Sequence, residues 1–90
     1  MDAAKIHVDL VDHQFNGGGI SGEVNSPELF KPIAFDYDDW RGPMLFNTKV
    51  DDALYNSQLP WLDPLDALVV VDVIERVVVE YLRARFEQAA

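Results

Sequence analysis

Cysteine is absent from the 90 residues of the chain, and basic residues are scarce. Without cysteine, disulfide frameworks, thiolate zinc sites, iron–sulfur clusters and cysteine nucleophiles are excluded. Seven Lys and Arg residues stand against sixteen Asp and Glu residues, which gives a net charge of -9. Because such a chain repels phosphate backbones, we expect no direct binding to DNA or RNA.

Long hydrophobic runs are missing as well. In the most apolar part of the chain, the longest uncharged stretch runs from Ala67 to Val71, whereas a membrane span needs about 20 apolar residues. The first seven residues lack the basic start and the apolar core of a secretory signal. We therefore expect a cytoplasmic protein with no membrane partner.

What is present is the composition of an ordinary globular domain. Hydrophobic residues make up 49% of the chain and charged residues 26%, and a chain of this length supports one core. We treat 1–90 as a single domain, with an acidic strand-and-loop body over 1–62 and a long amphipathic helix over 63–88.

Alternating hydrophobicity predicts the strands. Between Lys5 and Asp12, Ile6, Val8 and Leu10 share one face, which is the period of a half-buried strand. A glycine-rich turn over 16–19 follows. Further strands are predicted over 20–24, 33–37 and 44–46. Capping signals at Ser26-Pro27 and at Thr48 with Asp51 predict short helices over 26–30 and 50–57.

The last third of the chain predicts one long helix. Asp63-Pro64 supplies an N-cap followed by a first-turn proline. Beyond it, Asp72, Arg76 and Glu80 follow one another at helical spacing on a single charged stripe. The alternative is two buried strands over 69–74 and 77–81, but no turn residue separates them. The predicted fold class is therefore α+β, with a small antiparallel sheet of three or four short strands packed against this helix.

The apolar arc of the predicted helix is wider than packing on one sheet requires. It covers about 240° of the helix, where little more than 100° is needed, so its surplus must contact something else. One possibility is a second copy of the chain, forming a homodimer, and the other is coverage by a loop near Trp61. The predicted dimer interface comprises Val70, Ile74, Val77, Val78 and Tyr81.

Acidic residues concentrate around the segment 36–40. On a strand, Asp36 and Asp38 project from the same face, with Asp39 at the strand end and Trp40 beside it. Three carboxylates suit Ca²⁺ or Mg²⁺, but the spacing of a calcium loop is missing. A contact surface for a basic protein partner, or a plain solvated face, fits better. The predicted partner-binding residues are Asp36, Asp38, Asp39, Trp40, Asp51 and Asp52.

No catalytic constellation is recognisable. His7 and His13 are the two histidines, and on an unbroken strand they would lie about 20 Å apart, too far to share an ion. The serines lack the flanking glycines of a nucleophile elbow. We therefore expect no enzyme activity, no cofactor and no metal ion.

In size and charge the chain is similar to immunity proteins that block basic nuclease toxins. It is equally similar to phage-encoded anti-defence proteins, some of which imitate the charge of nucleic acid. This similarity implies an acidic inhibitor that occupies a cationic site on a partner protein. The alternative is a non-catalytic structural or accessory subunit that self-associates through its C-terminal helix.

Overall fold

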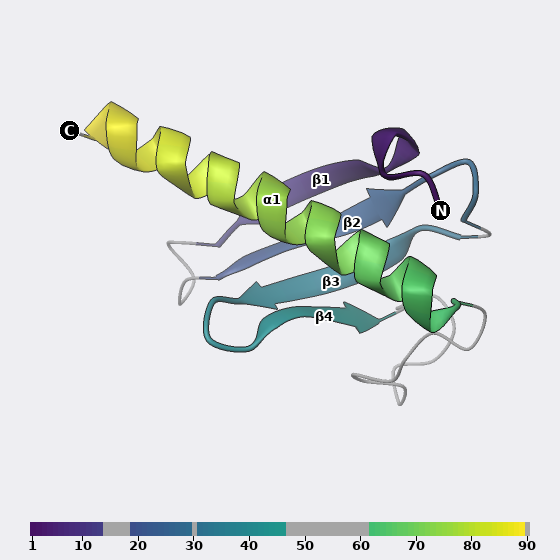
Figure 1. The fold of residues 1–90 in the computed structure, drawn as a ribbon. Helices are drawn as coiled ribbons and strands as arrows, with labels where there is room; N and C mark the ends of the chain where they lie inside the picture. The colour runs from purple at the N-terminus through teal and green to yellow at the C-terminus, as the bar shows by residue number, and fades with distance from the viewer. Residues whose placement is uncertain (14–18, 30, 47–61, 90) are drawn as a thin grey trace.

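One long helix lies across one face of a four-stranded antiparallel sheet (Figure 1). The computed structural model describes residues 1–13, 19–29, 31–46 and 62–89. The predicted α+β class is confirmed. The elements are a 3₁₀ turn η1 (Ala3–Lys5), β1 (His7–Asp12), β2 (Ile20–Asn25), β3 (Ile33–Asp38), β4 (Gly42–Phe46) and α1 (Pro64–Ala89).

The sheet is a simple meander in the order β1-β2-β3-β4. Its strands pair in continuous register, from His7 opposite Asn25 to Asp12 opposite Ile20 in the first pair. Successive antiparallel strands need only short connections. The meander is therefore the simplest arrangement of the four predicted strand segments.

Helix α1 begins at the predicted cap. The Asp63 carboxylate accepts a hydrogen bond from the Leu65 amide at 2.9 Å, and its carbonyl accepts one from the Ala67 amide at 2.8 Å. On the exposed side, Arg76 and Asp72 form an ion pair at 3.1 Å. The predicted helix is confirmed, and the alternative of two buried strands over 69–74 and 77–81 is wrong. Within the described residues, no helix combines the length and the apolar character needed to cross a membrane.

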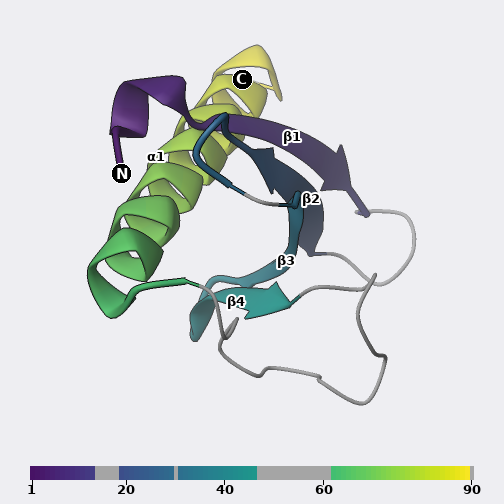
Figure 2. The ribbon, with the colours of Figure 1, turned by 90° about the vertical axis from the view of Figure 1, so that its right-hand side faces the viewer.

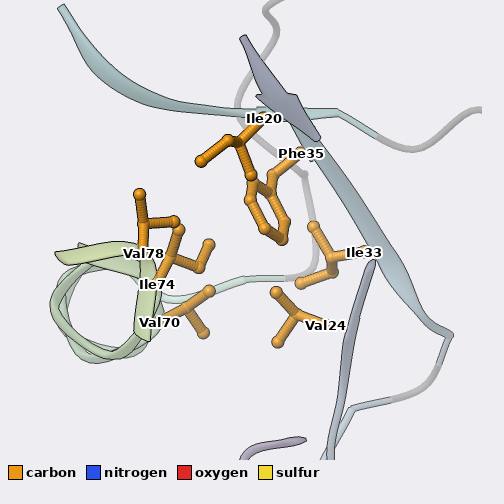
Figure 3. Packing of buried hydrophobic residues seen from close by; sticks show 7 residues of the cluster. All are labelled: Ile20, Val24, Ile33, Phe35, Val70, Ile74 and Val78. Carbon is orange, nitrogen blue, oxygen red and sulfur yellow. The ribbon is translucent and has the colours of Figure 1, made fainter. Parts of the chain in front are cut away.

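The core lies between the helix and the two central strands (Figure 3). Its side chains alternate along the strands and recur every three or four residues along the helix, which are the periods of the two element types. All of them are at most 4% exposed. They are Ile20 and Val24 of β2, Ile33 and Phe35 of β3, and Val70, Ile74 and Val78 of α1.

Three of the five residues predicted for a dimer interface face the chain's own sheet instead. Val70, Ile74 and Val78 are fully buried against the chain's own sheet, which leaves them no surface for a second copy. Val77 is half-buried, and the Tyr81 hydroxyl donates a hydrogen bond to Asp12. The sequence shows how wide the apolar arc is, but the choice of the part that faces the sheet depends on tertiary packing.

Part of the apolar arc of α1 is nevertheless exposed to solvent. Leu65, Leu68, Val79 and Phe86 of α1 are exposed, Phe86 by 69%. A helix of 26 residues is about 39 Å long, and the longest dimension of the molecule is 43 Å. The C-terminal part of α1 therefore extends past the sheet, as Figure 1 shows.

The two predicted short helices have different outcomes. At 26–30, the described residues form one hydrogen-bonded turn, in which the Leu29 amide donates to the Ser26 carbonyl at 3.0 Å. Pro32 disfavours helical geometry at the residue before it, so the turn ends without becoming a helix. The predicted helix over 50–57 lies outside the described residues.

Candidate protein-binding face

The sheet has one face without a covering helix in the described structure, and we call it the outer face (Figure 2). Because side chains alternate along a strand, inward Ile33 and Phe35 require that Ala34 and Asp36 point outward. The outer-face positions are His7, Asp9 and Val11 of β1, Ser21, Glu23 and Asn25 of β2, Ala34, Asp36 and Asp38 of β3, and Gly42 and Met44 of β4.

Negative charge dominates this face. Asp9 of β1 stands directly opposite Glu23 of β2 in the strand register, and both are exposed. Asp36 is exposed on the next strand, diagonal to Glu23. None of the outer-face positions of the described strands holds Lys or Arg. Like charges directly opposed across two strands are destabilising, so this arrangement costs the sheet some stability.

The β3–β4 turn adds an aromatic side chain at one end of the outer face. The Asp38 carboxylate accepts a hydrogen bond from the Trp40 amide at 3.4 Å and pairs with Arg41 at 3.5 Å. The Arg41 guanidinium lies 4.7 Å from the centre of the Trp40 ring. Positive φ at Gly42, +80°, lets the chain enter β4. Trp40 is held in this way while 77% exposed.

The structure places four predicted partner-binding residues together. Asp36 and Asp38 lie on the outer face of β3, and Asp39 and Trp40 lie in the turn that follows it. Asp51 and Asp52 lie outside the described residues. Asp9 and Glu23 are not among the predicted partner-binding residues. Alternation assigns each of them to a polar strand face, but only the pairing register makes them neighbours.

On the opposite face, Asp12 links the sheet to the helix. Its carboxylate accepts a hydrogen bond from the Tyr81 hydroxyl at 2.9 Å and pairs with Arg85 at 2.5 Å. The hydrogen bond to Asp12 is the largest cause of the raised pKa of Tyr81, since it stabilises the protonated phenol. The Asp12 side chain is only 15% exposed, so its charge is balanced inside the chain and adds nothing to the outer face.

A pocket of 240 Å³ opens beside this cluster, between the ends of the strands and the C-terminal half of α1. Burial, with the negative charges of Glu75 and Asp39, raises the pKa of Tyr37 in its wall. The volume is below the range of about 300–1,000 Å³ typical of small-molecule sites. The described residues that line it are Asp12, Gly19, Ile20, Tyr37, Asp39, Leu82 and Arg85.

The histidines do not assemble a catalytic or metal site in the described structure. His7 contacts Asp9 at 3.2 Å on the outer face, and the His13 ring contacts the Ser21 hydroxyl at 2.6 Å. Asp12 points to the opposite face, so it does not complete a triad with this pair. Among the described residues, no three carboxylate or imidazole groups lie close enough together to hold a metal ion.

The chain was compared with family models, with curated proteins and with solved structures. No family, no curated protein and no solved structure matches the chain.

Proposed function

We propose that this chain is a small acidic protein-binding module whose outer face occupies a cationic site on a partner protein. The observation that carries the proposal is the opposition of Asp9 and Glu23, beside Asp36, on a face without Lys or Arg at its described positions. Carboxylates gathered in this way raise the rate of encounter with a positively charged surface and select against acidic partners.

Trp40 supplies the apolar contact that charge alone lacks. Exposed tryptophan is among the residues that most often dominate binding energy at protein interfaces. Asp38 and Arg41 restrain the turn that carries it, which reduces the conformational entropy lost when the ring is buried by a partner. Acidic side chains flanking one restrained aromatic anchor suit a cationic surface with an apolar pocket.

The proposed mode of action is inhibition by occupancy. Sites that bind nucleic acid are rich in Lys and Arg, because they neutralise phosphates. A face of carboxylates binds the same cations and excludes the phosphates from them. A captured partner that holds an oligonucleotide is therefore expected to release it when the chain is added.

The test removes charge from one face at a time. In the outer-face variant, Asp9→Asn, Glu23→Gln and Asp36→Asn change the net charge from -9 to -6. Asp38 is left intact because its carboxylate holds the turn. Partners are captured from lysate at low and high salt and identified by mass spectrometry, and their affinities are then measured by calorimetry. We expect capture at low salt to weaken by about tenfold or more in this variant, because the removed charges are weakly screened at low salt and speed association with a cationic partner.

The matched control removes the same charge from exposed positions of α1, by Asp72→Asn, Glu80→Gln and Glu87→Gln. It is expected to leave capture nearly unchanged. Equal weakening by both variants would show that net charge, rather than the outer face, determines binding. Unchanged capture by the outer-face variant at low salt would refute the proposal.

Self-association through α1 is a second candidate function, supported by the exposed apolar residues Leu68, Val79 and Phe86. Their spacing puts them on one side of the helix, so a second copy could bury them. Sedimentation equilibrium at low micromolar concentration is expected to show a dimer that Leu68→Glu with Phe86→Glu dissociates. A single 10.2 kDa species in the unmodified protein would exclude this function.

A further inference from the structure

Strand β1 is an edge of the sheet, and its hydrogen-bonding phase is fixed. The His13 amide donates to the Gly19 carbonyl at 3.0 Å, and the pairing continues without a break to His7 opposite Asn25. In an antiparallel pair, hydrogen-bonded and non-hydrogen-bonded positions alternate. His7, Asp9 and Val11 therefore bond to β2, while the amide and carbonyl groups of Val8 and Leu10 point away from it.

No strand lies beyond β1 among the described residues. Within the described parts of the chain, no strand pairs with the outward backbone groups of Val8 and Leu10, which form a short row of donors and acceptors at this edge. The side chains of the same two residues pack against the core but are only half-buried. A further strand beside β1 would satisfy the backbone groups and would also cover these two side chains.

The two edges of the sheet differ in how they are protected. Pro43 lies within β4, and a proline cannot donate a backbone hydrogen bond to an added strand. The described residues of β1 include no Pro, no Lys and no bulge in the pairing with β2. β1 does carry two charged side chains, Asp9 on the outer face and Asp12 pointing inward to Arg85. Such charges disfavour pairing with a neutral or acidic strand, but they leave the edge able to pair with a basic one.

Charge selects the chemistry of that extended chain. Asp9 projects from β1 beside the edge, and Glu23 lies opposite it one strand further in. A second copy would bring another net charge of -9 and a second acidic outer face alongside the first. A cationic segment is instead attracted to both carboxylates.

We propose that β1 binds an extended basic segment of the partner protein as a fifth strand of the sheet. The inference rests on the proposed function, and it names the form in which the cationic site is presented. Alternate side chains of the added strand lie over the outer face near Asp9, and these are Lys or Arg. The intervening side chains lie beside Val8 and Leu10, and these are apolar.

The experiment uses a capped decapeptide of alternating Lys and Val as the probe, with amide hydrogen exchange of the full chain followed by NMR. On saturation, exchange at Val8 and Leu10 is expected to slow by about tenfold or more, because their amides become hydrogen-bonded. The amides of Asp9 and Val11 already bond to β2 and should change little. Two peptide controls have the same charge, one with scrambled order and one N-methylated at every second residue, and both are expected to bind more weakly.

A change on the protein side gives an independent readout. Val8→Pro removes one outward donor and leaves the hydrogen bonds to β2 in place. It is expected to weaken binding of the Lys/Val decapeptide, while circular dichroism shows that the fold is unchanged. If this variant does not fold, the N-methylated peptide still tests the same backbone contact.

Three other results would each overturn the proposal of strand addition. Salt-sensitive binding that the outer-face variant weakens, with no protection of Val8 and Leu10, would refute strand addition and leave the proposed function intact. Protection that appears without peptide and grows with protein concentration would assign the edge to a second copy. Absence of peptide binding at low salt would also refute strand addition. The proposed function would then be tested separately, by capture of partners from lysate with the outer-face variant.

Discussion

Replacing Phe35 with Ala is expected to lower the free energy of unfolding by about 3–5 kcal/mol. Phe35 has the largest fully buried side chain of the core and is 1% exposed, in contact with residues of β2 and α1. Deleting its ring removes buried apolar surface and leaves a cavity between the two layers. Domains of this size have total stabilities of about 5–15 kcal/mol, so the variant should be largely unfolded at temperatures where the parent is native. Urea denaturation followed by circular dichroism measures the change.

Phe86→Ala is the matched control, because it deletes the same ring from an exposed position of α1. Its cost is expected to stay within about 0.5 kcal/mol, as for other surface substitutions. A small effect at Phe35 would contradict the packing of α1 on β3. A large effect at Phe86 that depends on protein concentration would instead show that a second copy covers the helix.

Gly22→Ala is expected to have the second largest effect, a loss of about 1–3 kcal/mol through overpacking. Gly22 faces the core from β2, opposite Leu10 of β1 and Phe35 of β3. An added Cβ would lie 2.1 Å from the Asp9 carbonyl oxygen and 2.7 Å from the tip of the Phe35 ring. The ring can rotate, but the carbonyl belongs to the β1–β2 ladder, so two strands would have to move apart.

A double-mutant cycle separates these two collisions. In a Phe35→Leu background the contact with the ring is removed, and Gly22→Ala should cost less, by more than about 0.5 kcal/mol if the two residues are coupled. Gly19→Ala is the comparison, because its Cβ would meet nothing within 4 Å but its φ is +92°. Its cost is backbone strain of about 1–2 kcal/mol, and Phe35→Leu should not change it. Additive costs at Gly22 and Phe35 would contradict the contact.

The core and the outer face are chemically separate, which makes the functional variants interpretable. Asp9, Glu23 and Asp36 are exposed and lie across the sheet from the core cluster. Removing the opposed charges of Asp9 and Glu23 relieves repulsion, so the outer-face variant should be at least as stable as the parent. A variant that loses partner binding while keeping or gaining stability is the behaviour expected of a functional surface.

Local patterns in the sequence predicted the four strands and the long C-terminal helix in their observed order, but they also predicted a short helix over 26–30 where the structure has a single turn. The alternation of Ile6, Val8 and Leu10 gave the first strand, and Asp63-Pro64 gave the start of the long helix. These features are local, since period and capping depend only on residues within a few positions of one another. The acidic character of the 36–40 segment is local in the same sense.

Which of these residues become neighbours depends on tertiary packing. Asp9 and Glu23 are far apart in sequence, and the register of β1 on β2 makes them neighbours. Val70, Ile74 and Val78 belong to the same apolar arc as Leu68 and Phe86, yet the position of the helix on the sheet buries the first three and exposes the other two. Register and helix orientation are set by contacts between distant segments. A one-dimensional pattern therefore cannot state them, and both the acidic face and the open edge of β1 depend on them.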